Sequence, residues 1–224
     1  MTWVKICGMT NLEDALTAVE AGADAVGFVF YEKSPRNISV EAARGIIEKL
    51  PKKVEKVGVF VDLEAERIRE IVVHTGLSAV QLHGKRSVDS VWSSLLSGTS
   101  VECVAVSKVI LMVHGDDLKD EGMFFAPSGV FAVLLDSRSN GLVGGTGKTF
   151  DWEATRAMVE AISLGVPVIV AGGVTAFNVS EALRTFHPFG VDVASGVEAK
   201  PGKKDPEKVR AFVRAVREVD RKTG

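Results

Sequence analysis

Val130-Phe-Ala-Val-Leu-Leu-Asp136 is an apolar run of strand length that ends in a carboxylate. A polar loop that is rich in glycine follows it, from Ser137 to Thr149. Apolar runs of this kind are buried on both faces of a parallel sheet, so the first charged residue after the run lies at the carboxyl end of the strand. Asp136 is therefore a candidate general acid or base.

The same alternation of a short apolar run and a helical stripe recurs along the chain. The predicted strands are Trp3–Gly8, Ala25–Phe30, Lys56–Val61, Ala79–Gly84, Val101–Leu111, Val130–Asp136, Val166–Gly173 and Val191–Gly196. Eight strands that alternate with about eight helices in 224 residues predict an α/β fold, a single (β/α)8 TIM barrel over residues 1–224. The first and last strands both look fully buried, which favours a closed ring over an open sheet with exposed edges.

Polar residues mark where several predicted helices begin. Thr10-Asn-Leu-Glu13 has the pattern of a capping box, in which Glu13 reaches back to the backbone of Thr10. The residues predicted to cap later helices are Ser39, Asp62, Asn178 and Asp205. Residues 112–129 mix charged and apolar positions without a clear period, and we expect a degenerate helix there.

The composition argues against partners that require a strong electrostatic field. The chain has 27 basic and 29 acidic residues and a net charge of -2, so we expect neither a nucleic-acid nor a membrane partner. Its apolar runs are shorter than the roughly 20 residues of a bilayer span, and the first residues enter a strand directly. We therefore expect a cytoplasmic protein without a signal peptide. Monomer and homodimer both remain open.

The two cysteines are expected to be reduced thiols. Cys7 and Cys103 could pair in principle, but a chain with 46% hydrophobic residues does not need a disulfide for stability. Cys103 lies inside an apolar strand, where a thiol behaves as a small hydrophobic group. Cys7 is followed by glycine at a strand end, where it is either structural or, if its pKa falls below about 8.5, a nucleophile or base.

The candidate site residues lie at strand ends, because the loops after those ends build the active site of such a barrel. Asp136 could instead cap a helix or pair with Arg138. His83, at the end of the fourth strand, fits a hydrogen-bonded structural residue as well as a ligand contact. Lys5 lies on the inward face of the first strand and needs a partner there, for which Asp192 is a candidate.

Two turns predict an anion site. Gly172-Gly173 and Ser195-Gly196 follow the seventh and eighth strands, where barrels often bind phosphate through backbone N–H groups. The alternative is that both are only tight turns. Together they predict a phosphate-binding site at the mouth of the barrel.

The run from Gly141 to Thr149 looks at first like a nucleotide-binding P-loop. That motif requires glycine at position 142, and the chain has Leu142 there. The loop also does not begin directly at the strand end. We interpret Gly144 and Gly145 as part of a flexible loop that closes over a ligand and helps to hold its phosphate.

Motifs along nearly the whole chain are similar to those of one family. They are Lys5-Ile-Cys-Gly-Met-Thr10, Ser34-Pro-Arg36, Val80-Gln-Leu-His-Gly84, Leu135-Asp-Ser137, Gly144-Gly-Thr-Gly-Lys-Thr-Phe-Asp-Trp152, Ala171-Gly-Gly173 and Val191-Asp-Val-Ala-Ser-Gly-Val-Glu198. The chain resembles the phosphoribosylanthranilate isomerases, tryptophan-pathway enzymes with a single (β/α)8 barrel. It departs from the family pattern at Asn37, where an aromatic residue is frequent, and in the loop 138–140.

The resemblance implies an Amadori rearrangement of N-(5-phosphoribosyl)anthranilate to 1-(2-carboxyphenylamino)-1-deoxyribulose 5-phosphate. It makes Asp136 the general acid and Cys7 the general base, and it pairs Arg36 with the anthranilate carboxylate. His83 and Asp192 would contact the sugar or hold neighbouring groups. The implied partner is a small sugar phosphate, and no metal or redox cofactor is expected.

Two other functions compete with this one. The first is another sugar-phosphate isomerase on the same barrel, such as the analogous histidine-pathway enzyme. Enzymes that resemble it use paired aspartates, so Cys7 at the first strand end distinguishes the two. The second is a binding protein that keeps the barrel and its anion site but lacks catalysis.

Overall fold

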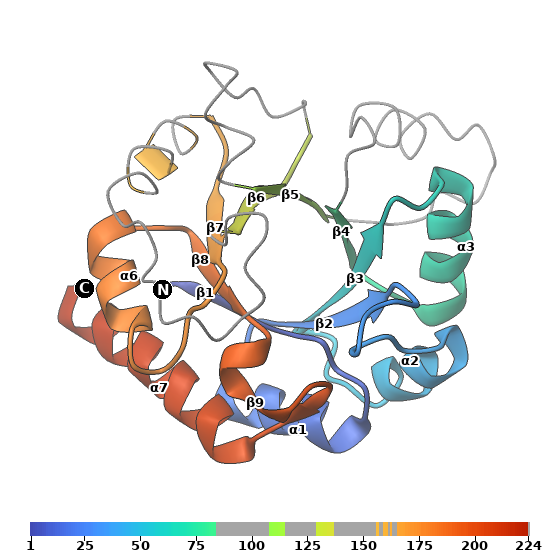
Figure 1. Cartoon of the computed structure of the whole chain (residues 1–224), viewed down its shortest axis with the longest axis horizontal. Helices are drawn as coiled ribbons and strands as arrows, with labels where there is room; N and C mark the ends of the chain where they lie inside the picture. The colour runs from blue at the N-terminus through green and yellow to red at the C-terminus, as the bar shows by residue number, and fades with distance from the viewer. Residues whose placement is uncertain are drawn as a thin grey trace.

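Eight parallel strands close into a ring in the computed structural model, which describes residues 1–83, 108–114, 129–136, 156, 159, 160, 162 and 165–223. The strands are β1 (Trp3–Cys7), β2 (Ala25–Phe30), β3 (Glu55–Val61), β4 (Ala79–His83), β5 (Lys108–His114), β6 (Ala132–Asp136), β7 (Val168–Ala171) and β8 (Gly190–Val193). Each pairs with the next, and β8 pairs with β1 (Figure 1). The predicted (β/α)8 barrel is confirmed.

The helices lie around the outside of this ring (Figure 1). Those with bounds among the described residues are α1 (Leu12–Ala21), α2 (Val40–Ile47), α3 (Ala65–Thr75), α6 (Val179–Phe186) and α7 (Pro206–Thr223). Figure 1 shows α7 beside α1 and α6, the two helices it contacts. Thr2 donates to the Asp220 carboxylate of α7 from its backbone N–H at 3.0 Å and from its hydroxyl at 2.7 Å.

The side chains of each strand alternate between two cores, because successive residues of a strand point to opposite faces. Outward residues such as Val4 and Ile6 pack with the apolar faces of the helices. Inward residues such as Val57, Ile110 and Ile169 fill the interior of the barrel. Apolar surface is therefore removed from water on both sides of every strand, as expected for a parallel sheet.

The pair of Lys5 and Asp192 joins β1 to β8 at the point where the ring closes. The two residues are direct neighbours in the strand register, and Lys5 Nζ lies 2.9 Å from Asp192 Oδ1. Lys5 is fully buried. Burial would lower its pKa, but the Asp192 charge and a hydrogen bond hold that pKa above its usual value. The predicted partner of Lys5 is thus confirmed.

The helix caps agree with the sequence in part. Ser39 Oγ accepts from the N–H of Ala42, and Asp205 Oδ1 accepts from the N–H of Glu207, as expected for capping residues. The predicted capping box is wrong by one residue, because Asn11 caps α1 through a bond from the N–H of Asp14. The short amide reaches the third N–H of the helix from that position.

The prediction for Asp62 is wrong, and the prediction for Asn178 is correct in position but not in its hydrogen bond. Asp62 lies before α3 in the left-handed region with φ 48°, and Glu64 occupies the cap position, where its side chain does not accept from the N–H groups of the first turn. Asn178 occupies the cap position of α6, yet its amide faces away from the helix. Its Oδ1 accepts from the N–H of Thr175 at 2.7 Å, and its Nδ2 donates to the carbonyl of Gly173 at 3.1 Å. Asn178 therefore braces the loop before the helix.

The ends of several strands differ from the prediction. β5 extends to His114, so the degenerate helix expected at 112–129 is wrong at its start; residues 101–107 and 115–128 lie outside the described residues. β7 ends at Ala171 and β8 at Val193. A 3-10 turn, η1 (Ser195–Val197), follows β8 and holds the Ser195-Gly196 pair that was expected in the strand.

A small antiparallel hairpin, absent from the prediction, follows η1. Its strands are β9 (Glu198–Lys200) and β10 (Lys203–Lys204). Asp14 of α1 fixes it: its carboxylate accepts from Lys203 Nζ at 2.8 Å and from the N–H of Lys204 at 2.7 Å. Desolvation would raise the pKa of Asp14, but these hydrogen bonds hold it below its usual range.

Among the helices that the structure describes, none combines the length and the apolar character that crossing a bilayer requires.

Asp14→Ala should destabilise the fold far more than Glu13→Ala. Both carboxylates bind Lys203, but Asp14 is 1% exposed and also accepts from the backbone N–H of Lys204, whereas the Glu13 side chain is 76% exposed. We expect Asp14→Ala to lower the free energy of unfolding by roughly 2 kcal/mol or more, and Glu13→Ala to change it little. Equilibrium urea denaturation at pH 7 measures both. Equal losses would contradict the role given to Asp14.

Candidate active site

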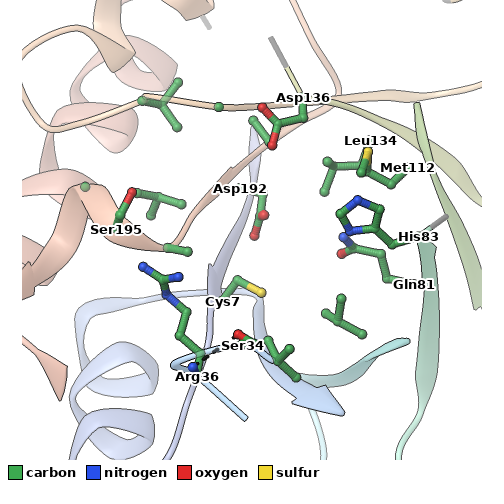
Figure 2. A pocket seen from close by; sticks show the side chains of 18 of the residues that line it. Cys7, Ser34, Arg36, Gln81, His83, Met112, Leu134, Asp136, Asp192 and Ser195 are labelled. Atoms are coloured by element: carbon green, nitrogen blue, oxygen red, sulfur yellow. Dashed lines mark hydrogen bonds between the residues drawn. The ribbon is translucent and has the colours of Figure 1, made fainter. Parts of the chain in front are cut away.

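A pocket of about 400 Å³ opens at the carboxyl ends of the barrel strands. Polar side chains and the turns after β7 and β8 line it together with apolar groups (Figure 2). The polar residues are Cys7, Tyr31, Ser34, Arg36, Gln81, His83, Asp136, Asp192 and Ser195. Segments from every part of the described chain therefore meet at one mouth.

Cys7 lies at the base of this pocket at the end of β1. It is 7% exposed, is a free thiol, and packs with Val29 and Val59. The thiol fits because β2 has no side chain beside it: a Cβ on Gly27 would lie 2.7 Å from Cys7 Sγ. Burial raises the pKa of the Cys7 thiol, although the charges of Lys5 and Lys204 act to lower it.

Asp136 and His83 border the mouth at the ends of β6 and β4. Asp136 is paired in the strand register with His114 of β5 and Ala171 of β7. The backbone carbonyl of His83 accepts from the N–H of Asp62 at 3.0 Å, which fixes the end of β4 against the loop after β3. In Figure 2 the Asp136 carboxylate lies above the pocket, with Cys7 lower and His83 to one side.

The turns after β7 and β8 form one wall of the pocket. Gly172 and Gly173 have φ of 84° and 73°, values that residues with a side chain rarely adopt. Gly196 of η1 approaches the loop after β7 so closely that a Cβ there would lie 2.2 Å from the carbonyl of Val174. This wall consists mainly of backbone and of the Ser195 hydroxyl, which suits the recognition of an anion by N–H groups.

Arg36 is held in the pocket wall by a carboxylate that the sequence analysis did not single out. Its Nε lies 2.8 Å from Glu198 Oε1 and its Nη2 lies 2.6 Å from Glu198 Oε2. Such a bidentate pair fixes both the position and the plane of the guanidinium. Glu198 uses two of the five N–H groups, so the edge formed by Nη1 and Nη2 keeps donors for a ligand.

Lys204 is the second residue that the sequence analysis missed. Its Nζ is fully buried and donates to the carbonyl of Cys7 at 2.6 Å, to the carbonyl of Ala194 at 3.1 Å and to Glu198 Oε1 at 3.0 Å. Burial lowers the pKa of Lys204 in spite of the Glu198 charge. The ammonium thus joins the ends of β1 and β8 to the carboxylate that orients Arg36.

Only one of these two residues carried a signal in the sequence. Glu198 ends the Val191-to-Glu198 motif, so an inward carboxylate near Arg36 could have been suspected. Lys204 occurs in a polar stretch, Lys200-Pro-Gly-Lys-Lys204, that looks like a solvated turn. The hairpin of β9 and β10 buries it, and no local pattern predicts that hairpin.

Most residues proposed for the site from sequence are brought together. Those that line the pocket are Cys7, Arg36, His83, Asp136, Gly172, Gly173, Asp192, Ser195 and Gly196. Gly144 and Gly145, which were expected to help to hold a phosphate, lie outside the described residues. Asp192 faces the pocket but already binds Lys5, so part of its hydrogen-bonding capacity is taken.

A closed (β/α)8 barrel with a thiol, a carboxylate, an arginine and two glycine turns at its carboxyl-end mouth defines the molecule as an enzyme of the barrel class. The family model described as "N-(5'phosphoribosyl)anthranilate (PRA) isomerase" matches residues 4–215. The chain therefore belongs to the N-(5'-phosphoribosyl)anthranilate isomerase family.

Individual relatives support this assignment. The chain is 44% identical to an N-(5'-phosphoribosyl)anthranilate isomerase of Trichlorobacter lovleyi, over 97% of this chain and 99% of that protein. A solved phosphoribosyl anthranilate isomerase in complex with reduced 1-(o-carboxyphenylamino)-1-deoxyribulose 5-phosphate is 36% identical, with a TM-score of 0.75, 97% of this chain covered and 100% of that chain. Monomers generated from the dimeric Thermotoga maritima enzyme are 37% identical, with a TM-score of 0.73 and the same coverage.

Glu198→Gln should destabilise the protein in a manner that depends on pH. Burial would raise the pKa of Glu198, but the bonds from Arg36 and the charge of Lys204 hold it below its usual value of about 4.3. The ionised carboxylate therefore stabilises the fold at pH above that value, and this contribution disappears as the pH falls through the lower pKa of the folded state. We expect a loss of roughly 3 kcal/mol at pH 7 that shrinks below about pH 4.

Urea denaturation at several pH values measures this difference. Glu48→Gln is the matched control, because Glu48 pairs with Arg44 at 2.8 Å on an exposed helix surface. Its substitution should have little effect at any of these pH values. A loss in Glu198→Gln that stays the same from pH 7 to pH 3 would show that the charge of Glu198 is not the cause.

Proposed function

We propose that this chain catalyses the Amadori rearrangement of N-(5-phosphoribosyl)anthranilate to 1-(2-carboxyphenylamino)-1-deoxyribulose 5-phosphate, with its own residues in defined roles. The observation that carries the proposal is that Cys7 and Asp136 line the same pocket as the glycine turns of β7 and β8. An acid, a base and an anion cradle therefore surround one small volume. The reaction needs these three groups.

Asp136 acts first, as the general acid. Opening the furanose ring requires a proton on the ring oxygen, because the C1–O bond breaks and the oxygen leaves as a hydroxyl. The nitrogen lone pair of the anthranilate forms a C1=N iminium as that bond breaks. Asp136, at the mouth of the pocket, donates this proton and ends the step as a carboxylate.

Cys7 acts second, as the general base. The iminium acidifies the hydrogen on C2, and the thiolate takes it as a proton, while the C2–H electrons form an enolamine. A proton returned at C1 and loss of the proton from the C2 hydroxyl then give the ketone. Since burial raises the pKa of Cys7, the thiolate is the minor form at neutral pH. The positive charges of Lys5 and Lys204 act to lower this pKa and so increase the fraction of thiolate.

The remaining groups bind and orient the substrate. The free edge of Arg36 binds the anthranilate carboxylate, a planar ligand suited to two parallel N–H bonds. The phosphate is held by backbone N–H groups at Gly172, Gly173 and Gly196 and by Ser195, and the loop with Gly144 and Gly145 contributes to the same task. His83 and Asp192 contact the sugar.

We propose three further assignments, which concern location, oligomeric state and domain organisation. A cytoplasmic location is supported by the biosynthetic role of the family and by the expected reduced thiols. The chain is a monomer or a homodimer, and the dimeric relative from Thermotoga maritima supports the homodimer. We also propose that residues 1–224 form one barrel domain.

Turnover of N-(5-phosphoribosyl)anthranilate, followed by the loss of its fluorescence, tests the proposed reaction directly. The purified chain should consume this substrate in a saturable manner. A chain that binds the substrate without consuming it would instead be the non-catalytic binding protein considered from sequence. Turnover of the corresponding histidine-pathway substrate alone would favour the other isomerase.

Cys7→Ser and Asp136→Asn should each lower kcat by about 100- to 10,000-fold, with a much smaller effect on KM. Both substitutions keep the shape of the side chain and remove its acid or base function. Asp24→Asn is the control, since Asp24 binds Val4 N–H and Arg217 at the amino end of the strands, away from the pocket. Its kcat should match that of the unmodified enzyme. A near-normal kcat in either pocket variant would remove its residue from the proposed mechanism.

The reactivity of Cys7 should report its raised pKa. Only the thiolate is alkylated, so a higher pKa moves the rise of the alkylation rate to higher pH. We expect the rate of reaction with iodoacetamide to increase about tenfold per pH unit from pH 6 to pH 9 without reaching a plateau. Peptide mass spectrometry distinguishes Cys7 from Cys103. The urea-unfolded chain is the control, with half of its rise near pH 8.5; a plateau by pH 7 in the folded chain would refute the expectation.

A further inference from the structure

Gln81 presents a polar group that the fold itself does not use. It lies in β4, is 5% exposed and lines the pocket between Cys7 and His83. Among the buried side-chain nitrogen and oxygen atoms of the described residues, its Oε1 is the one without a hydrogen-bond partner. A buried amide oxygen without a partner destabilises a folded protein. An apolar side chain of the same size would give a more stable barrel.

Gln81 lies on the side of the pocket opposite the turns after β7 and β8, where a bound ligand would contact it. β4 and β8 are four strands apart in a ring of eight, so they lie on opposite sides of the pocket. Figure 2 shows Gln81 facing the pocket across from Ser195. A ligand whose phosphate binds at the turns after β7 and β8 must extend its carbon chain from that wall toward the side that β4 provides.

The hydrogen-bonding capacity of the Gln81 amide indicates which group of the substrate it binds. A glutamine side chain both donates and accepts, and a half turn about its last bond exchanges the two ends. A carboxylate can only accept, and the amine of the anthranilate enters the reaction as a donor only. A sugar hydroxyl does both, so it can bind whichever end of the amide faces the pocket.

We propose that the Gln81 amide binds a secondary hydroxyl of the sugar-phosphate chain and orients the carbon chain between Asp136 and Cys7. The inference rests on the proposed function, since it assumes a sugar-phosphate substrate. It adds a ligand contact on the wall opposite the phosphate. Gln81 itself takes no proton, and it supplies whichever end of its amide faces the substrate hydroxyl.

Gln81→Met tests this inference, because methionine keeps the length of the side chain and removes the amide. We expect kcat/KM to fall about 3- to 10-fold or more, while the thermal midpoint stays at or above that of the unmodified chain. Gln81→Leu repeats the test with a branched side chain. Thr75→Val is the control: it removes a buried hydroxyl that donates to the Ile71 carbonyl at 2.6 Å in α3, and its kinetic constants should not change.

Three competing inhibitors locate the contact. Reduced 1-(2-carboxyphenylamino)-1-deoxyribulose 5-phosphate and ribulose 5-phosphate both carry sugar hydroxyls, and both should bind Gln81→Met about 3- to 10-fold more weakly. Inorganic phosphate carries none and should bind equally well. Unchanged KM and inhibitor affinities overturn the inference. It is also overturned if inorganic phosphate weakens as much as the others, or if ribulose 5-phosphate binding does not change.

The experiments distinguish a failure of the Gln81 contact from a failure of the proposed reaction. If the unmodified chain fails to convert N-(5-phosphoribosyl)anthranilate, the proposed reaction is wrong whatever the variants do. If it converts this substrate and Gln81→Met behaves identically in kinetics and binding, the reaction stands and the hydroxyl contact is wrong.

Discussion

The pairing of β1 with β8 is the constraint on which the rest of the structure depends. It joins residues that are 187 positions apart, Lys5 and Asp192, through a buried ion pair. Because all the strands run parallel, closing the ring places their carboxyl ends on one face. A thiol from the first strand and the turn after the last one therefore become neighbours. An open sheet of the same strands would separate them by its full width and would expose two edges.

Just beneath the mouth of the pocket, positive and negative side chains alternate in a connected set of ion pairs. Arg36 contacts Glu198, and Glu198 contacts Lys204, whose ammonium also binds the carbonyl of Cys7. Separating any of these charges from its partner in a buried region is costly, so each one restricts the position of the next. The guanidinium is oriented before any ligand arrives, which would reduce the entropy lost on binding the planar carboxylate proposed as its ligand. The hairpin that carries Lys204 thus contributes to the site from outside the barrel.

The sequence predicted the parts of this arrangement that leave a local pattern. Apolar runs separated by capped helical stripes identified the eight-stranded barrel, and polar residues after those runs identified Cys7 and Asp136 as candidates. Strand ends were less accurate: η1 follows β8 where more strand was expected, because Gly196 must pass close to the Val174 carbonyl. Lys204 was not found, since burial of its ammonium depends on three oxygens supplied by distant segments. Such pairings are decided by the tertiary structure, and no period in the sequence records them.

The close approach of the Cys7 sulfur to Gly27 limits which side chains the two positions can hold. The sulfur atom occupies the volume that a side chain at position 27 would fill. The side chains of these two positions, which are paired on neighbouring strands, therefore compete for the same volume. A bulkier side chain at position 7 could not be accommodated by a smaller residue at position 27, because glycine already has no side chain. A descendant that enlarged position 27 would have to shorten position 7. A substitution at either of these two positions is therefore limited by the size of the other, whereas the loops at the mouth accept new side chains without this restriction.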